Sequence, residues 1–304
     1  MKVNVIIRIV AFSVAILLLS FILFSSIDQN YYFENGRLNS YEMAGPEPTE
    51  SPNQMNQHEI SAQIQNIEID WVAGSIVIHR SDSLSSIIVA ESCPTYSEYE
   101  TVIKQSGQTL KIQFSEESME FPSFGINADV SKDLVIRVPS NWNCNNLEID
   151  AAEAEVYIYD LSINEMDFDG ASGNLILDNC NIVDLDIDTA SGDVEFTGIL
   201  RELDFQAASA KFNGEFFQMP NHLNMETMSG DLDIVLPEYC PFACEIDTMS
   251  GSFTTDFATT QENGIYIHGS KDHACHINVS AMSGDVSILK GVDVPVTAGE
   301  NCDH

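Results

Sequence analysis

LDIDTASGDVEF, residues 185–196, has the alternation of a half-buried β-strand interrupted by a corner of small residues. Apolar side chains can point to one side: Leu185, Ile187, Ala190, Val194 and Phe196. Acidic side chains can point to the other: Asp186, Asp188, Asp193 and Glu195. Gly192 allows a sharp bend at the corner, because it carries no Cβ. The stretch therefore predicts two strands joined by a tight corner.

The same unit recurs along the chain. Clear copies are MDFDGASGNLIL (166–177), LNMETMSGDLDI (223–234), CEIDTMSGSFTT (244–255) and INVSAMSGDVSI (277–288). Weaker copies are IEIDWVAGSIVI (67–78), LEIDAAEAEVYI (147–158) and LDFQAASAKFNG (203–214). Aligned on Gly192, the corner residues are Gly74, Ala154, Gly173, Gly192, Ala210, Gly230, Gly251 and Gly284.

The spacing of these corners predicts the fold. Successive corners are 80, 19, 19, 18, 20, 21 and 33 residues apart. A strand unit that repeats about every 19 residues is typical of stacked coils, since one unit cannot bury its apolar side alone. We therefore predict an all-β solenoid, or β-helix, with coils of about 19 residues.

Apolar positions of the copies predict ladders that point into the solenoid. One ladder comprises Leu147, Met166, Leu185, Leu203, Leu223, Cys244 and Ile277, and the next begins at Ile149 and Phe168. Two residues before each corner, alanines give way to methionines along the chain: Ala152, Ala171, Ala190, Ala208, Met228, Met249 and Met282. We interpret these methionines as adaptable core side chains rather than as metal ligands.

The N-terminus predicts a membrane anchor. Lys2 and Arg8 precede an almost wholly apolar run over residues 9–27, which as a helix would span a bilayer core of about 30 Å. No clear cleavage site follows, so residues 1–27 are predicted to form an uncleaved transmembrane signal anchor, with a cleaved signal as the alternative. The basic end would stay in the cytoplasm, which places the rest outside as a single-pass membrane protein.

The remaining chain divides into four segments. Residues 28–58 are polar and lack apolar periodicity, as expected of a flexible linker. Residues 59–140 predict a less regular β region that caps the solenoid, with strands near 67–80, 85–92, 99–107, 109–117 and 133–140. Residues 141–291 form the regular repeats, and residues 292–304 form a tail.

The chain is strongly acidic. It holds 47 acidic and 12 basic side chains among 304 residues, a formal net charge of −35. Phosphate backbones are bound by clustered Lys and Arg, so we expect no nucleic-acid partner. Such a field would also repel anionic lipids and polymers.

Acidic side chains recur at fixed positions before the corners. Four residues before a corner lie Asp70, Asp150, Asp169, Asp188, Glu226 and Asp247, and six residues before lie Glu68, Glu148, Asp167, Asp186, Asp204 and Glu245. Carboxylates on strands about 4.8 Å apart repel each other, by about 0.9 kcal/mol per pair in bulk water. Either the ladders are a solvated face that keeps the sheet soluble, or Ca²⁺ bridges successive coils. The first calcium ligands to consider are Asp167, Asp169, Asp186 and Asp188. No other cofactor is expected.

Seven cysteines are present: Cys93, Cys144, Cys180, Cys240, Cys244, Cys275 and Cys302. Their spacing matches no zinc pattern. KDHACH (271–276) gathers His273, Cys275 and His276, with His268 and Cys240 as further candidates for a transition-metal site. The preferred interpretation is an exposed loop with a Cys240–Cys275 disulfide or free thiols. Cys244 falls on an apolar ladder and is expected in the core.

The serial small-Ser-Gly-Asp/Asn corners, VIRVP (135–139), IVLP (234–237) and the N-terminal anchor resemble the bacterial putative-adhesin family of β-strand repeat proteins, a domain of unknown function. The resemblance covers roughly residues 59–290. It implies a right-handed β-helix-like fold and a role at the cell surface or envelope, beside envelope-stress signalling systems in some members. It implies no catalytic residue. The chain departs from the pattern at Ala154 and Ala210, where the corner glycine is lost.

Catalytic motifs are not found, including GxSxG, HExxH and a phosphate-binding loop. We therefore expect no enzyme, but a non-catalytic, extracytoplasmic, adhesin-like binding module whose ligand is a cell-surface protein or a glycan. It would bind through a flat ladder face or through the loops at 235–244 and 256–276. One alternative is a structural or regulatory envelope protein that acts through its anchor on a membrane stress-signalling system. A lesser alternative is a calcium-dependent β-helix protein that binds or cleaves a glycan.

Overall fold

A computed structural model of the chain describes residues 55–92, 101–115, 131–270 and 274–291. Their 19 strands form one continuous sheet, and these residues contain no helix. The all-β prediction is confirmed. The predicted anchor, most of the predicted linker and the predicted tail lie outside the described residues. No helix long and apolar enough to cross a membrane is found in the part of the chain that the structure describes.

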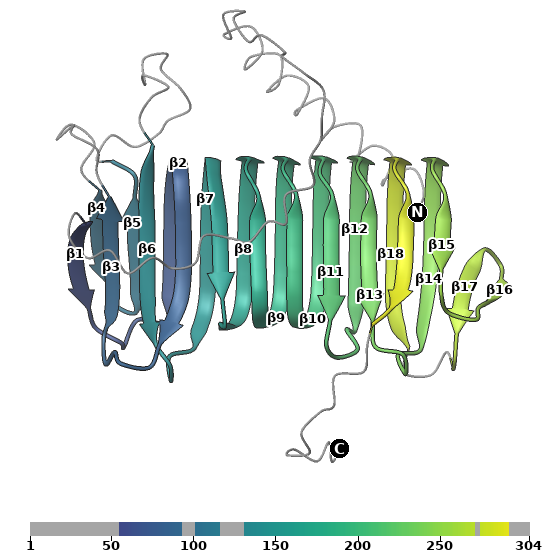
Figure 1. The fold of residues 1–304 in the computed structure, drawn as a ribbon, viewed down its shortest axis with the longest axis horizontal. Coiled ribbons are helices and arrows are strands. Elements are labelled where there is room, and N and C mark those ends of the chain that lie inside the picture. The colour runs from purple at the N-terminus through teal and green to yellow at the C-terminus, as the bar shows by residue number, and fades with distance from the viewer. Residues whose placement is uncertain (1–54, 93–100, 116–130, 271–273, 292–304) are drawn as a thin grey trace, which may run out of the picture. The chain divides into compact units, whose positions relative to one another are not determined.

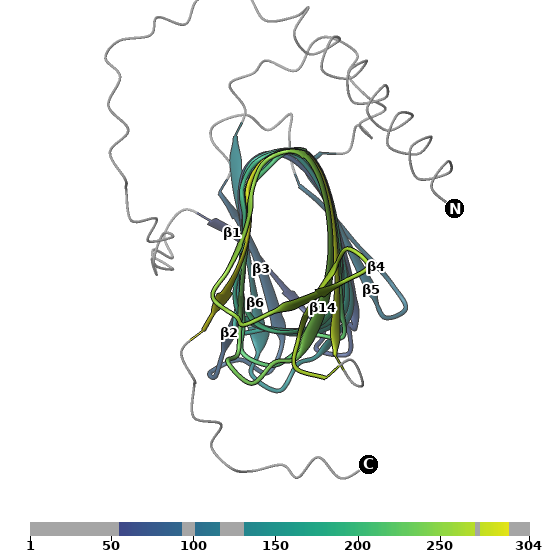
Figure 2. The same cartoon turned by 90° about the vertical axis from the view of Figure 1, so that its right-hand side faces the viewer.

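Parallel coils stack side by side, and each coil runs up one flat side and down the other (Figures 1 and 2). In the centre, β9 (Leu175–Ser191) and β10 (Val194–Ser209) pair over both sides. On one side Leu185 pairs with Leu203, and with Met166 of β8 (Ser162–Ser172). On the other side Leu175 pairs with Val194, and with Val156 of β7 (Cys144–Tyr159). Residues one repeat apart in sequence are thus neighbours across the sheet.

The coils near the C-terminus do not stack in the order of the sequence. β18 (Cys275–Ser283) pairs with both β12 (His222–Ser229) and β14 (Phe242–Ser250), all in parallel. On the other flat side, β19 (Val286–Lys290) likewise pairs with both β13 (Leu232–Leu236) and β15 (Phe253–Thr255). Figure 1 shows β18, the most yellow strand, between β12 and β14. The predicted ladder order Leu223, Cys244, Ile277 is therefore wrong in space, where Ile277 lies between the other two.

At the other end, β2 (Asn66–Ser81) is also an inserted coil. Along one edge it pairs in parallel with β7. Along its other edge it pairs in parallel with β5 (Thr109–Gln113) and β6 (Lys132–Pro139). Antiparallel strands follow outside: β3 (Ile87–Ser92) on β6, β1 (Met55–Ile60) on β3, and β4 (Val102–Ser106) on β5. The strands expected within residues 67–140 are thus present, and the first repeat lies directly beside the second.

A buried lysine joins the strands of this end. The Lys132 Nζ donates to the Phe114 carbonyl at 2.5 Å, to the Thr101 hydroxyl at 2.6 Å and to the Glu91 carboxylate at 3.4 Å. It also lies 4.3 Å from the centre of the Phe114 ring and 5.0 Å from that of Trp71. Several partners therefore compensate for burying this charge.

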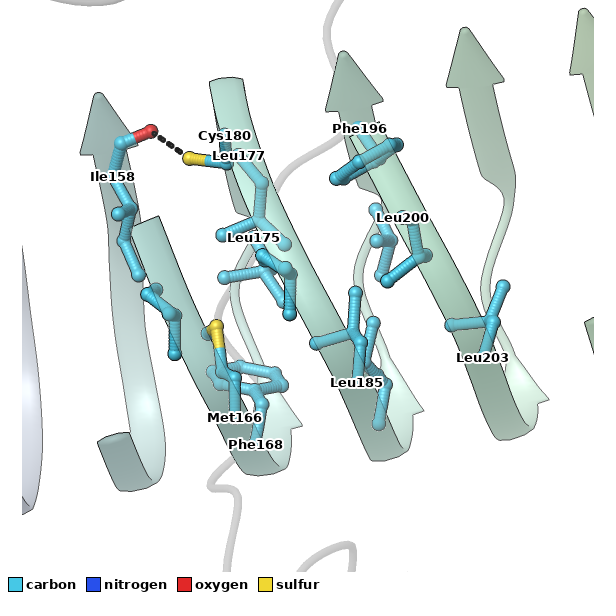
Figure 3. Packing of buried hydrophobic residues seen from close by; sticks show 14 of the residues in the cluster. Ile158, Met166, Phe168, Leu175, Leu177, Cys180, Leu185, Phe196, Leu200 and Leu203 are labelled. Atoms are coloured by element: carbon cyan, nitrogen blue, oxygen red, sulfur yellow. Dashed lines mark hydrogen bonds between the residues drawn. The ribbon is translucent and has the colours of Figure 1, made fainter. Parts of the chain in front are cut away.

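The core consists of the inward side chains of both flat sides. Figure 3 shows Met166, Leu185 and Leu203 in one row across successive coils, with Leu175, Leu177 and Phe196 opposite them. Phe205 and Phe212 of the next coil pack with their ring centres 5.3 Å apart, where β11 (Phe212–Phe216) faces β10. The predicted apolar ladders are accordingly buried.

Close approach between coils explains the corner glycines. Gly192 has φ of 117°, and a Cβ there would lie 1.9 Å from the Gly173 carbonyl oxygen of the preceding coil. Ala154 and Ala210 lack a positive φ and are buried, so the backbone at their corners differs from that at the glycine corners.

Asp and Asn side chains that follow the corner glycine bind the next coil. The Asn174 Oδ1 accepts the Asp193 N–H at 2.8 Å, and the Asp193 Oδ1 accepts the Lys211 N–H at 3.3 Å. The Asp231 Oδ1 accepts the Asp285 N–H at 3.0 Å. Corner Asp and Asn are therefore hydrogen-bond acceptors that hold coil to coil.

The interpretation of the corner methionines as core is wrong. Met249 is 81% exposed and Met282 43% exposed. In these repeats the buried residue is the one directly before the methionine or alanine position, for example Thr189, Thr227 and Ala281. The two-residue period of the strand continues up to this residue and turns the following one outward.

Candidate binding face

Carboxylates gather on one flat side of the central coils. Asp167 pairs with Asp186 and Asp169 pairs with Asp188, each across adjacent strands. Asp186 in turn pairs with Asp204. A further row, eight residues before the corners, places Asp184 between its partners Glu165 and Glu202. We call the surface formed by these rows the acidic face, and its carboxylates are Glu68, Asp70, Glu148, Asp150, Glu165, Asp167, Asp169, Asp184, Asp186, Asp188, Glu202 and Asp204.

The acidic face is bounded by groups that donate hydrogen bonds. At the β5 end, the Lys111 Nζ lies 3.1 Å from Asp70 and 3.7 Å from Glu68, and the Gln113 amide donates to Asp70 at 3.0 Å. At the β12 end, the Asn224 amide donates to Asp204 at 3.0 Å. Apart from Lys111, no described residue forms an ion pair with a carboxylate of the acidic face.

Partial burial and neighbouring carboxylates weaken the acidity of the central carboxyls. Partial burial, followed by the carboxylates of Asp204 and Asp167, raises the pKa of Asp186 to about 6. Burial and then Asp186 and Asp169 raise the pKa of Asp188 to about 6, and its buried Oδ1 has no hydrogen-bond partner among the described residues. Burial, followed by the carboxylate of Asp169, raises the pKa of Asp150 to about 6. The face therefore holds more negative charge than its own surroundings stabilise.

Acidic residues at the corners behave differently. The Asp285 carboxylate accepts hydrogen bonds from both the N–H and the hydroxyl of Ser252, at 2.8 Å each, which lowers the pKa of Asp285. Corner acids are thus satisfied within the fold, whereas the central acids of the acidic face are not. This contrast separates the structural carboxylates from those available to a partner.

The four aspartates predicted as calcium ligands lie together, in two adjacent coils. Among the described residues, however, no group of three or more His, Cys, Asp or Glu side chains is arranged to hold a metal ion. Their carboxylates lie in rows across the adjacent strands. The surroundings of Asp167, Asp169, Asp186 and Asp188 therefore do not form a ready-made calcium site.

The predicted His/Cys group is not assembled in the part that the structure describes. His273 lies outside the described residues, as do Cys93 and Cys302. The ring of His276 stacks on that of His222 with centres 5.2 Å apart, and the His268 Nδ1 lies 2.9 Å from the Ala258 carbonyl oxygen.

Cys240, Cys244 and Cys275 are fully buried free thiols. Of the two states considered for Cys240 and Cys275, the structure therefore contains the thiols, and in the core rather than in an exposed loop. Burial raises the pKa of Cys240 and of Cys244 to about 12, so these thiols stay protonated. Cys244 occupies the core position that its ladder predicted.

Sequence reasoning missed the third acidic row and the role of Lys111. The row of Glu165, Asp184 and Glu202 has the same period as the other two and could have been found by extending the alignment outward. The position of Lys111 could not, because β5 lies beside β2 only after the intervening chain has folded back.

Fold and site together define a parallel β-solenoid with one acidic flat face. The chain belongs to the Toastrack DUF4097 family, whose model matches residues 64–289. The predicted resemblance to a putative-adhesin family of unknown function is thereby confirmed.

Solved structures with a similar chain course include those of putative adhesins and of a putative lipid binding protein. A putative adhesin from Bacteroides fragilis has a TM-score of 0.40 and 11% identity, covering 79% of this chain and 98% of its own. A putative cell adhesion protein from Clostridium sporogenes has a TM-score of 0.33 and 12% identity, covering 78% of this chain and 99% of its own. A putative adhesin from Parabacteroides distasonis has a TM-score of 0.34 and 13% identity, covering 78% of this chain and 97% of its own. These likenesses are too distant to carry an argument about function. A comparison with curated proteins finds no match.

Proposed function

We propose that this chain is a non-catalytic binding module that is anchored in the cell membrane by residues 1–27 and presents its acidic face outside the cytoplasm to a basic region of a cell-surface protein. The observation that carries the proposal is the charge of the face. Burial, followed by neighbouring carboxylates, raises the pKa of Asp150, Asp186 and Asp188 to about 6, and none of the three forms an ion pair with another described residue. A partner rich in Lys and Arg would relieve this repulsion and gain affinity from it.

The flatness of the face supports a protein partner over a small substrate. Carboxylates repeat about every 4.8 Å across the strands and about every 6.6 Å along them, which suits an extended basic surface. A right-handed coil is part of the proposal, because connections between parallel strands are right-handed in nearly all sheets.

Binding to an immobilised basic protein such as histone tests the proposal, measured by surface plasmon resonance with the 53–304 unit. That unit is compact by itself. We expect Asp184→Asn with Asp186→Asn to weaken binding at least tenfold at physiological salt. The control is Glu195→Gln with Glu215→Gln, which removes two charges from the opposite flat side, where β10 pairs with β11. Equal losses for both pairs would show that only net charge matters and would contradict the proposal.

The same unit separates a binding module from a regulator that acts through its anchor. A binding module keeps its activity without residues 1–52, whereas a membrane regulator needs residues 1–27 to signal. Full retention of binding by the 53–304 unit therefore supports the module. A loss that is restored only by the full chain in detergent would favour the envelope regulator.

Calcium is the second candidate occupant of the face, favoured by the paired aspartates Asp167 with Asp186 and Asp169 with Asp188. Because these carboxylates form no ready-made site, an ion would have to bridge two coils with much of its water shell retained. A calcium titration of the thermal melt at fixed ionic strength tests this idea. A rise in Tm that magnesium does not reproduce, and that Asp186→Asn with Asp188→Asn abolishes, would support it. Equal shifts with magnesium would refute it.

A further inference from the structure

Three methionines lie outward at the corners of three adjacent coils: Met228 on β12, Met282 on β18 and Met249 on β14. Met249 is 81% exposed and Met282 43% exposed, while Met228 is half-buried. By contrast, Met166 and Met225 are buried in the core, and Met219 packs partly against it. Met249 and Met282 therefore lie outside the core, and earlier coils carry alanine at the same position.

The interleaved order of the coils brings the three side chains together. Thr227 and Ser229, which flank Met228, pair with Ala281 and Ser283, which flank Met282. Ala281 and Ser283 also pair with Thr248 and Ser250, which flank Met249. Met282 is therefore the central member, with one methionine on each side at the strand spacing of about 4.8 Å.

This spacing lets three sulfurs share one ion. With metal–sulfur bonds of about 2.3 Å, the two outer sulfurs must lean inward by roughly 3 Å. A methionine has three rotatable bonds beyond its Cα and can make that adjustment without moving the strand. No other group of three outward methionines occurs among the described residues.

Thioether sulfur selects the class of ligand. It is a soft, neutral donor that prefers Cu(I) and similar ions over Ca²⁺ or Mg²⁺, which require oxygen. Neutral ligands leave the positive charge of the ion uncompensated. Glu226 and Asp247 lie two residues before Met228 and Met249 on the same outward side, so that the local field is negative and favours a cation.

We propose that Met228, Met282 and Met249 form a binding site for one monovalent soft metal ion, Cu(I) by its chemistry. The site uses the corners near the C-terminal end and not the acidic face of the central coils. It therefore stands independently of the proposed protein partner.

Silver(I) is a suitable probe, because it is soft and monovalent and does not change its oxidation state in air. The experiment uses the full chain in detergent micelles, with Cys93→Ser and Cys302→Ser to remove the thiols outside the described residues. All ten methionines are labelled with ¹³C at the methyl group and followed by NMR during the silver titration. We expect three methyl signals to shift together and to saturate at one ion per chain.

Single Met→Leu variants assign these signals to Met228, Met249 and Met282. The control is Met219→Leu, which should leave the shifts and the stoichiometry unchanged. In a separate competition with bicinchoninate under reducing conditions, the triple Leu variant should bind Cu(I) at least 100-fold more weakly than the parent, while Met219→Leu stays within twofold. Because Met249 and Met282 are exposed and Leu is close to Met in size, these variants should melt like the parent.

Two results would overturn the proposal. One is a silver titration in which the shifted signals belong to other methionines, or in which fewer than three of the assigned signals move. The other is equal Cu(I) affinity for the parent and the triple variant. Zinc, which is poorly bound by thioethers, should shift none of the three signals, and a zinc effect equal to that of silver would also contradict a soft-ion site.

Discussion

At the scale of single residues, the environment of a carboxylate decides whether it is structural or available. Asp285 and Asp188 are both acids of the repeat. Asp285 receives two hydrogen bonds from Ser252, which lower its pKa, whereas burial and then the charges of Asp186 and Asp169 raise the pKa of Asp188 to about 6. A lowered pKa means that the fold stabilises the ionised form, and a raised one means that it opposes this form.

Neutralising a central carboxylate should therefore stabilise the protein. We expect Asp188→Asn to raise the free energy of unfolding at pH 7 by about 1 kcal/mol, after allowance for solvent screening, and the Tm by about 2–4 °C. Asp285→Asn serves as the control, since it weakens the acceptor of two hydrogen bonds and should lower the Tm. A lower Tm for Asp188→Asn at pH 7 would show that its charge is already compensated.

The pH dependence of stability follows from the same raised pKa values. Between the ordinary Asp pKa near 4 and the folded value of about 6, the folded state holds more protons than the unfolded state. The free energy of unfolding therefore falls as the pH rises through this window. Thermal melts should give a higher Tm at pH 5 than at pH 7, and Asp186→Asn with Asp188→Asn should reduce the difference. A Tm that rises steadily from pH 5 to pH 7 would contradict this expectation.

At the scale of elements, the corner determines how closely two coils approach. The Gly192 position has both a left-handed backbone and a carbonyl oxygen where a Cβ would lie, whereas Gly107 has φ of 61° with open space around it. Substitution of Gly107 would therefore test backbone strain alone, whereas substitution of Gly192 would test backbone strain together with a steric clash.

Gly192→Ala should destabilise the protein by about 3 kcal/mol or more, because the corner must open to relieve the clash. Gly107→Ala should cost only about 1 kcal/mol, since it adds strain without a clash. Urea unfolding monitored by circular dichroism measures both. Similar losses for the two variants would mean that the coils can separate at the corner at little cost.

At the scale of the whole molecule, the coils near both ends of the solenoid do not stack in the order in which they occur in the sequence. β18 and β19 come last in the chain but lie between β12 and β14 and between β13 and β15. β2 comes early and yet lies between β7 and the strands β5 and β6. The end coils are therefore held by segments that fold back onto the stack.

Removing residues 275–304 should do more than shorten the solenoid. β14 would lose its parallel partner along Phe242–Ser250, and only Phe242–Glu245 would keep a neighbouring strand, the antiparallel β17 (Ile265–His268). We therefore expect the amides of residues 246–250 to exchange rapidly with solvent in the truncated chain. Hydrogen exchange measured by mass spectrometry checks this, with deletion of residues 292–304 alone as the control. Slow exchange of residues 246–250 in the truncated chain would indicate that β14 can pair directly with β12.

Many features of the fold could be predicted from local sequence. Alternation such as that of Leu185 to Asp188 identifies a strand with one buried side, and the spacing of Gly173, Gly192 and Gly230 identifies stacked coils. The two carboxylate rows containing Asp167 and Asp186 follow from the same period. The methionines were assigned to the wrong side, because the pattern does not show at which residue the strand bends into the corner.

The sequence by itself determined the strands, their buried sides, the corners and most of the acidic face, because these depend on periods of two and of about 19 residues that are written along the chain. Only the tertiary structure decided which coils are neighbours, where Met228, Met249 and Met282 point, and which carboxylates remain uncompensated. The physical reason is that repeats of similar sequence can pair with one another in several orders. The loops and the capping strands select one order, and long-range contacts then set the surroundings of every outward side chain.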